Sequence, residues 1–182
     1  MVREQREAFS KDVIVRVAED DATELVGTQR IVLLKETEGE RMLPIWVGAP
    51  EGDALAFRVT GETTPRPMTS DLMAELVRVT GARVERVVVT SIREKVFYAV
   101  VALAVDGHLD ELDARPSDAL NLAVRVGAPI FVAAEVMDQS AMLPDEVSAR
   151  MDADVADVGM ELPAGEWRSL SAELLGSLYR WP

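Results

Sequence analysis

Along the first half of the chain, hydrophobic and polar residues alternate over short stretches that turn-forming residues separate. This period of two is typical of strands with one buried face and predicts strands over residues 13–19, 29–36 and 41–47. A Gly-containing turn at residues 38–40 predicts that the last two strands pair as a hairpin. Because Pro44 lacks a backbone donor, it is expected at an edge of the sheet or at a strand start rather than in a central strand.

Hydrophobic residues recur with the period of a helix near residues 50–60, 70–80 and 116–126. A proline opens the first and the third of these helices, where its missing N–H costs nothing. In the second helix, Thr69 or Ser70 is expected to be the cap. An apolar stripe of that helix is expected to face the core, and it consists of Leu72, Leu76 and Val79.

The helix predicted at residues 116–126 has two faces. Apolar side chains at helical spacing form the face that is expected to pack, and they are Ala119, Leu122, Ala123 and Val126. Three polar residues fall on a second face, three and four positions apart: Asp118, Asn121 and Arg125. This second face is expected to be free to act.

The second half of the chain contains four predicted strands, at residues 84–90, 96–105, 108–114 and 128–133. Polar residues 91–95 are expected to join the first two. The Asp106-Gly107 pair predicts a hairpin whose second strand runs antiparallel to the first and leads directly into the helix at 116–126. Beyond them, a helical turn is expected at residues 135–140.

These elements predict an α/β (α+β) fold, a single domain with a mixed, largely antiparallel sheet flanked by helices. That domain is expected to span residues 1–140. Residues 141–182 are expected to form an acidic C-terminal extension with a short helix (144–151), a linker (152–166) and a terminal amphipathic helix (169–179). The apolar stripe of the terminal helix is expected to dock on its own domain or to contact a partner: Leu170, Leu174, Leu178 and Trp181.

The composition of the 182 residues limits the cellular locations and the classes of binding partner that are expected. The chain has no cysteine, no long apolar run that suits a bilayer and no apolar signal region in its first ten residues, so a cytoplasmic protein without a membrane partner is expected. The net charge of −13 disfavours contact with a polyanion. Binding of nucleic acid therefore requires a local basic patch or a bound metal.

Two corners of the chain repeat one combination of residues: Arg66-Pro67-Met68-Thr69-Ser70-Asp71 and Arg115-Pro116-Ser117-Asp118. Each corner places an arginine before a proline, a hydroxyl at a helix start and an aspartate in the first turn. The free N–H groups and positive dipole of a helix start suit phosphate, and an arginine adds a planar fork for its oxygens. The combination predicts phosphate binding, although a first-turn aspartate also stabilises the helix end by itself.

Carboxylates near these corners are candidate ligands for Mg²⁺ or Mn²⁺, which prefer oxygen. They are Glu51, Asp71, Asp113 and Asp118. A metal held by them would polarise a phosphodiester and generate hydroxide. The metal-ligand set we predict is Glu51, Asp71 and Asp118, with Mg²⁺ or Mn²⁺ as the cofactor.

Five stretches of the sequence resemble the bifunctional nuclease family over about residues 10–140. They are Leu43-Pro44-Ile45-Trp46-Val47-Gly48 followed by Glu51; Arg66-Pro67 with Thr69 and Asp71-Leu72; Val96-Phe97-Tyr98-Ala99; Asp113-Ala114-Arg115-Pro116-Ser117-Asp118-Ala119; and Ala128-Pro129-Ile130 with Val132. The run from Asp113 to Ala119 is the most specific of them. The resemblance implies an α/β domain and a nuclease that acts on both DNA and RNA.

The sequence departs from the family pattern at two positions. Family members commonly read Thr-His-Asp-Leu where this chain has Ser70, and Glu-Ala where it has Gly52. Since a serine hydroxyl does not titrate near neutrality, hydrolysis here would depend on a metal or on a carboxylate base. The single histidine, His108, follows a predicted turn and is expected to be an exposed turn residue.

The first hypothesis is therefore a nuclease with DNA and RNA as substrates. Its predicted catalytic residues are Asp71, Asp113 and Asp118, and its predicted substrate-binding residues are Arg66, Arg115 and Ser117. The second hypothesis is a non-enzymatic binding or regulatory module for a phosphorylated ligand or a protein partner. A third is that the corners serve packing and homo-oligomerisation, with Arg115 and Asp118 paired across an interface. A homo-oligomer is expected in any case.

Overall fold

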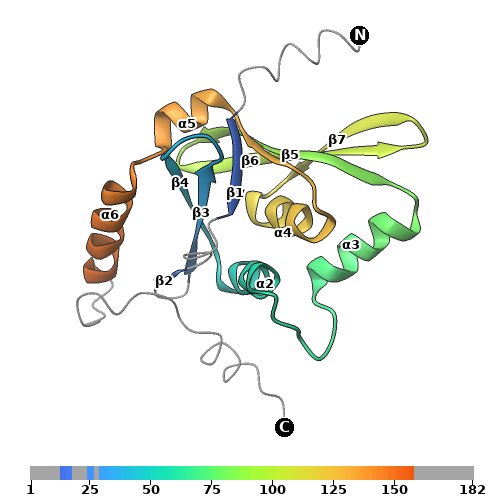
Figure 1. The fold of residues 1–182 in the computed structure, drawn as a ribbon, viewed down its shortest axis with the longest axis horizontal. Coiled ribbons are helices and arrows are strands. Elements are labelled where there is room, and N and C mark those ends of the chain that lie inside the picture. The colour runs from blue at the N-terminus through green and yellow to red at the C-terminus, as the bar shows by residue number, and fades with distance from the viewer. Residues whose placement is uncertain (1–12, 18–23, 27–28, 158–182) are drawn as a thin grey trace.

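One mixed sheet forms the centre of the molecule in the computed structural model, which describes residues 13–17, 24–26 and 29–157 (Figure 1). Its strands are β1 (Val13–Val17), β2 (Glu24–Val26), β3 (Gln29–Glu36), β4 (Met42–Gly48), β5 (Arg83–Arg93), β6 (Val96–Val105), β7 (His108–Ala114) and β8 (Ile130–Val132). They lie in the order β2-β3-β1-β8-β5-β6-β7, with β4 paired to β3. Only β5 and β8 pair in parallel among these strands, so the predicted α+β fold with a largely antiparallel sheet is confirmed.

Two hairpins show how local sequence sets this sheet. At the β6–β7 turn, Asp106 and Gly107 both have positive φ, as the prediction requires. The predicted polar connection at 91–95 is wrong, because β5 continues to Arg93 and pairs with β6. The turn itself is only Glu94 and Lys95, which also have positive φ.

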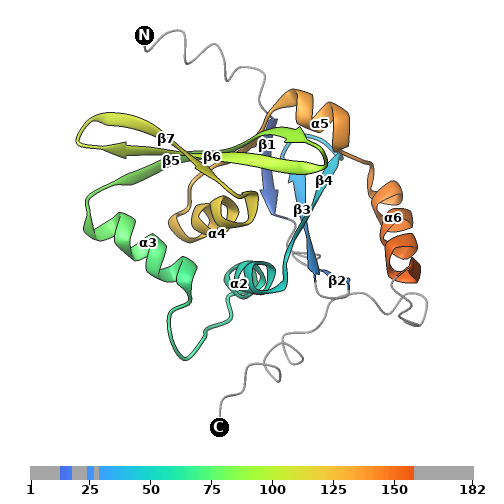
Figure 2. The same cartoon turned by 180° about the vertical axis from the view of Figure 1, so that it is seen from behind.

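Five helices of the described residues pack around the sheet: α2 (Ala49–Thr60), α3 (Thr69–Val79), α4 (Pro116–Val126), α5 (Ala134–Ser140) and α6 (Pro144–Asp157). Helix α4 contacts both α2 and α3, and it packs on β5 and β6, so it lies at the centre of the helical layer (Figures 1 and 2). Helix α6 lies apart from these three, beside β4. No helix of the described ranges is both long and apolar enough to cross a bilayer.

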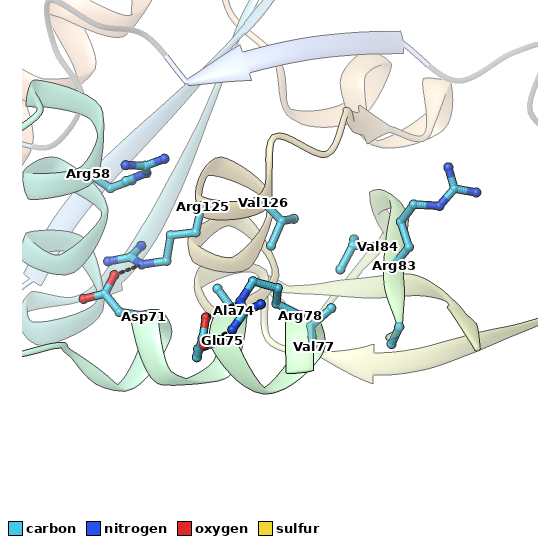
Figure 3. Close-up of a pocket in the computed structure, with 11 residues that line it drawn as sticks. Arg58, Asp71, Ala74, Glu75, Val77, Arg78, Arg83, Val84, Arg125 and Val126 are labelled. Atoms are coloured by element: carbon cyan, nitrogen blue, oxygen red, sulfur yellow. Dashed lines mark hydrogen bonds and ion pairs between the residues drawn. The ribbon is translucent and has the colours of Figure 1, made fainter. Parts of the chain in front are cut away.

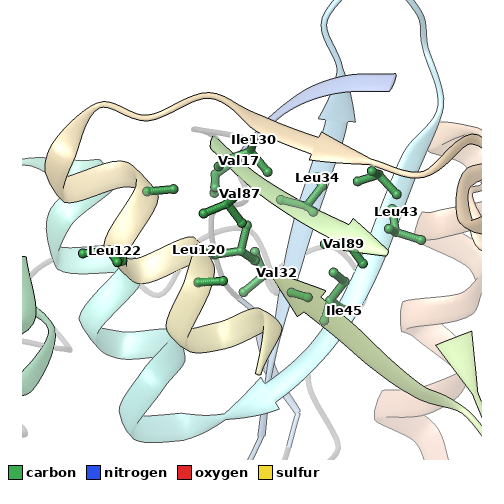
Figure 4. Close-up of a cluster of buried hydrophobic side chains, with 14 of the residues drawn as sticks. Val17, Val32, Leu34, Leu43, Ile45, Val87, Val89, Leu120, Leu122 and Ile130 are labelled. Atoms are coloured by element: carbon green, nitrogen blue, oxygen red, sulfur yellow. The ribbon is translucent and has the colours of Figure 1, made fainter. Parts of the chain in front are cut away.

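The core lies between the sheet and helix α4 (Figure 4). Leu120 and Ala123 of α4 are fully buried there against Val87 and Val89 of β5 and Val32 of β3. Alternate residues of β5 and of β3 supply the sheet side of this core, with Val32 and Leu34 coming from β3. Burial of α4 on the sheet fixes where its first turn lies, and that turn carries the Arg-Pro-Ser-Asp corner.

Helix α3 packs by a different face from the one predicted. Leu72, Leu76 and Val79 are 57%, 54% and 58% exposed, so the prediction that they face the core is wrong. The helix instead turns Met73, Ala74 and Val77 toward the core. Both stripes have helical spacing, and only the position of α3 against α4 and β5 selects between them.

The helix near the end of the described chain is longer than the predicted helix at residues 144–151. Helix α6 runs to Asp157, so the linker predicted to begin at residue 152 is wrong for its first six residues. Val147 of α6 packs with Ile31 and Leu33 on the face of β3 away from α4. The amphipathic helix predicted at 169–179 lies outside the described residues.

Candidate functional site

The first turns of α2, α3 and α4 meet around one hollow of about 270 Å³. Glu51 comes from the first turn of α2, Ser70 from that of α3, and Arg115 and Asp118 from the start of α4. Three segments separated by many residues thus bring their helix starts to one place. Because the first N–H groups of a helix have no intrahelical partner, such a convergence favours a bound anion.

Prolines and a capping carboxylate explain why each helix begins at this hollow. Pro50 and Pro116 lie in the first turns of α2 and α4, where a proline is well tolerated. The cap of α3 is Met68, and its N–H donates to the Asp71 carboxylate at 2.8 Å. The prediction that Thr69 or Ser70 caps this helix by its side chain is therefore wrong, and the Ser70 hydroxyl is left for the hollow.

Arg115 joins the two carboxylates of the hollow. Its Nη2 lies 3.0 Å from Oε1 of Glu51, and its Nε lies 2.7 Å from Oδ2 of Asp118. The hydrogen bonds that Arg115 donates to Asp118, and then to Glu51, raise the pKa of the Arg115 guanidinium. The Arg115–Asp118 pair lies within one chain, three residues apart, and pairing of these two residues across an interface stays a prediction.

Ser70 is the unexpected member of the site. The residue is 8% exposed, and its Oγ has no hydrogen-bond partner among the described residues. A buried hydroxyl without a partner costs free energy, so an unpaired one in a hollow indicates a place where a ligand atom bonds. The sequence predicted Ser70 as a possible helix cap and as a departure from the family's histidine, but not as a site residue, and its signal was its place directly before Asp71 at a helix start.

Asp71 faces away from Arg115 and toward α4. Burial opposes its ionisation, but the Met68 N–H and the Arg125 guanidinium outweigh burial, so the pKa of Asp71 lies below its usual value. Nε of Arg125 donates to Oδ1 of Asp71 at 2.6 Å. Asp71 therefore caps α3 and pairs with Arg125, whereas Glu51 and Asp118 pair with Arg115.

The polar face of α4 is not free, contrary to the prediction. The Asn121 amide donates to the carbonyl of Glu51 at 2.8 Å and to the carbonyl of Ser117 at 2.9 Å. The Arg125 side chain is 5% exposed and also donates to the carbonyl of Ala54 at 3.0 Å. Asn121 and Arg125 thus hold α2 and α3 on α4, and of the three residues Asp118 and Asn121 line the hollow while Arg125 does not.

Glycine at position 52 lets α2 approach the sheet closely. A Cβ on Gly52 would lie 2.5 Å from Cβ and Cγ of Arg30 in β3. That arginine is buried, and its Nε donates to Oδ1 of Asp53 at 2.7 Å. The departure from the family pattern noted at this position is thereby linked to the packing of the helix that carries Glu51.

Besides Asp71, three more predicted site residues lie outside the hollow. Asp113 is exposed on β7 opposite Val100, and Arg66 is exposed in the loop before α3. Ser117 is buried, so its side chain is not accessible for the predicted contact with a substrate. His108 is exposed at the start of β7, as expected. The structure therefore brings together Glu51, Arg115 and Asp118 of the predicted residues and adds Ser70.

The predicted metal-ligand set is not assembled. Among the described residues, no three carboxylate or histidine side chains cluster closely enough to hold a metal ion. Glu51 and Asp118 share a guanidinium as their common cation, and Asp71 binds a different arginine. The protein groups therefore do not fit a metal site built from these three side chains.

Comparison with known proteins agrees with the resemblance in the sequence. The family model described as bifunctional nuclease domain matches residues 32–145, which include all the residues around the hollow. An uncharacterized protein of Mycobacterium tuberculosis is 40% identical over 119 residues, which are 65% of this chain and 71% of that protein. Bifunctional nuclease 1 of Oryza sativa subsp. japonica and the bifunctional nuclease of Oryza minuta are each 32% identical over 105 residues, 56% of this chain but 32% of each plant protein.

Proposed function

This chain belongs to the bifunctional nuclease domain family, and we propose that it hydrolyses phosphodiester bonds of DNA and RNA in the hollow between the starts of α2, α3 and α4. One observation carries the proposal. Arg115 is held between the carboxylates of Glu51 and Asp118, beside the buried hydroxyl of Ser70, which has no hydrogen-bond partner in the described part of the chain. A cation for phosphate, candidate bases and an unused donor thus lie in one hollow.

Phosphate binding comes first in the proposed reaction. The Ser70 hydroxyl donates to a non-bridging oxygen, and the free N–H groups of the helix starts face the same oxygens. The Arg115 side chain is 65% exposed, so its guanidinium can turn from a carboxylate toward the phosphate. A guanidinium binds two phosphate oxygens through its planar fork and neutralises the charge that develops on them.

When the Arg115 side chain rotates toward the phosphate, the carboxylate that it leaves is free to act as a base. Asp118 or Glu51 then accepts a proton from a water molecule while the water oxygen attacks phosphorus. The bond from phosphorus to one bridging oxygen breaks, and that oxygen leaves as a hydroxyl after taking a proton from solvent. One product carries a terminal phosphate and the other a terminal hydroxyl. No step of this reaction is assigned to a metal, and the Mg²⁺ or Mn²⁺ requirement stays a prediction.

The test is cleavage of labelled single- and double-stranded DNA and RNA, each with Mg²⁺, Mn²⁺ or EDTA. We expect Asp118→Asn and Arg115→Gln to lower the rate by at least 100-fold. Asp110→Asn makes the same change of charge at an exposed position of β7 and is expected to leave the rate within twofold. Equal cleavage by the parent and Asp118→Asn would refute the proposal. Loss of cleavage in Asp113→Asn would move the chemistry to β7.

A second candidate is a binding module for a phosphorylated ligand. The unpaired Ser70 hydroxyl favours it, because this group binds phosphate but does not titrate near neutrality. The discriminating measurement is thermal unfolding with nucleotides and with oligonucleotides. If mononucleotides raise the melting temperature through Ser70 and Arg115 while no substrate is cleaved, the binding module is the correct function.

Location and assembly complete the proposal. A cytoplasmic homo-oligomer is proposed, in line with the absence of cysteine from the chain. The exposed aliphatic stripe of α3, namely Leu72, Leu76 and Val79, is the surface that such an assembly would cover.

A further inference from the structure

A second hollow, of about 490 Å³, lies between α3, the end of α4 and the start of β5, and arginines line it (Figure 3). The four arginines are Arg58, Arg78, Arg83 and Arg125, and the carboxylates beside them are Asp71 and Glu75. In a chain of net charge −13, this is a local excess of positive charge. It is the kind of basic patch that polyanion binding requires.

This hollow connects to the proposed catalytic hollow through a third one. The third hollow, of about 320 Å³, shares Arg58, Asp71 and Arg125 with the arginine-lined hollow. It shares Met68 with the catalytic hollow. The third hollow therefore adjoins both of the others near the start of α3, and we refer to the second and third together as the arginine groove.

Three of the arginines are available for a ligand. Arg58 is exposed, it has no salt bridge to any described residue, and its Nε is 3.4 Å from the carbonyl oxygen of Val124. Arg78 pairs with the exposed Glu75, and Arg83 pairs with Glu85. Ion pairs between exposed side chains contribute little, so a phosphate can compete for these guanidinium groups. Arg125 is buried and committed to Asp71.

The walls of the groove suit a nucleotide chain. Val77, Val84 and Val126 line the same hollow as the arginines, and Val126 is 38% exposed. Apolar groups beside separated guanidinium groups can contact sugars and bases while the phosphates face the arginines. Hollows of a few hundred Å³ admit single nucleotide units, whereas the width of a duplex exceeds them.

We propose that the arginine groove binds the phosphate backbone of a single-stranded nucleic acid that continues from the catalytic hollow. The proposal rests on the proposed function for its substrate class. Arg58, Arg78 and Arg83 each neutralise one phosphate outside the bond that is cleaved. The groove therefore sets affinity for strands longer than the few nucleotides that the catalytic hollow holds.

The test is fluorescence anisotropy with a labelled 20-nucleotide phosphorothioate strand, which resists cleavage, in EDTA at several salt concentrations. The groove variant carries Arg58→Gln, Arg78→Gln and Arg83→Gln. The control variant carries Lys35→Gln, Arg93→Gln and Lys95→Gln, which change the net charge equally away from the groove. We expect at least tenfold weaker binding for the groove variant at low salt, and a slope of log affinity against log salt reduced by about 2. The control is expected within twofold of the parent.

Equal binding by the groove and control variants would overturn the proposal, as would a parent that binds no strand at low salt. Equal weakening for a duplex of the same length would overturn the assignment to single strands. The two proposals fail separately. If the parent cleaves nothing but binds the strand through the three arginines, the groove stands and the nuclease does not. If cleavage depends on Asp118 while binding ignores the arginines, the reverse holds.

Discussion

Arg125, in the last turn of α4, donates from Nε to Oδ1 of Asp71, in the first turn of α3, at 2.6 Å. The same guanidinium reaches the carbonyl of Ala54 in α2 at 3.0 Å, so one buried side chain ties together three helices. The hollow with Glu51, Ser70 and Asp118 lies at the starts of those helices. The geometry of the proposed site therefore depends on a residue that is not part of it.

Replacement of Arg125 by methionine is expected to destabilise the fold and widen the site. The change leaves Asp71 and the carbonyls of Asn121 and Ala54 without their donor. Because the Asp71 side chain is 37% exposed, water can replace part of the lost contact, and the expected cost is about 2 kcal/mol. Chemical unfolding would measure this change against Arg93→Met, which replaces an exposed arginine of β5. Equal stability of the two variants would contradict the role of Arg125 as the clamp of the helical layer.

The Asp71–Arg125 pair predicts a pH dependence of stability. Because the pKa of Asp71 is lowered in the folded state, its contribution is complete well above pH 4. As the pH falls, the unfolded chain takes up this proton first, and the contribution is lost as the pH passes through the folded pKa. We expect the parent to have a higher free energy of unfolding than Asp71→Asn at pH 7. This difference is expected to shrink as the pH falls below about 4. A difference independent of pH would contradict this assignment.

Gly52→Ala is expected to lower stability although alanine is the better helix former. The added Cβ meets the Arg30 stem at 2.5 Å, and that stem is fixed by the buried bond to Asp53. Overpacking costs about 2 kcal/mol, which exceeds the gain of about 1 kcal/mol in helix propensity. A drop in melting temperature would measure the balance. An unchanged value would show that α2 moves away from β3 without cost.

Ser70→Ala separates a ligand contact from a structural one. Since the Ser70 hydroxyl has no partner among the described residues, its removal is expected to leave stability unchanged or slightly higher. Binding of phosphate or an oligonucleotide is expected to weaken about tenfold, which corresponds to roughly 1.4 kcal/mol for one lost bond to a charged group. Calorimetric titration beside thermal unfolding tests both halves. A large fall in melting temperature would assign the hydroxyl a structural role.

The exposed stripe of α3 predicts a change of assembly state on mutation. Leu72 and Leu76 are each more than half exposed, and apolar patches of this kind usually mark a contact surface. We expect the parent to be a homo-oligomer and Leu72→Ser with Leu76→Ser to shift it to smaller species. Light scattering after size exclusion measures the mass. A monomeric parent would contradict the prediction, and Val96→Ser on the β5–β6 hairpin is the control.

Local signals were sufficient for most elements of the sheet and helices. The Asp106-Gly107 turn needs residues that accept positive φ, and it lies where the sequence predicts it. Pro44 correctly indicated an edge, because β4 pairs only with β3 among the described strands. The Glu94-Lys95 turn was missed since neither residue type favours positive φ, and pairing of β5 with β6 imposes it.

The candidate site was predicted only in part, and the reason is packing between helices. First-turn positions selected Glu51 and Asp118, which both line the hollow, because spacing along one helix is a local property. The same reasoning put Asp71 with them, although the contact with Arg125 holds it elsewhere. Periodicity also offered two apolar stripes on α3, and it gave no means to choose the buried one.

The sequence by itself determined most of the strands and helices, the two Arg-Pro corners and membership of the family, since propensity, turn chemistry and motif order are encoded locally. The tertiary structure decided which of these residues meet. It joined Glu51 to Arg115, separated Asp71 from Asp118 and gathered arginines from α2, α3 and β5 along one groove. The physical reason is that helix α4 buries its apolar face on the sheet and its polar face on two other helices, and these long-range contacts fix the side chains that share a hollow.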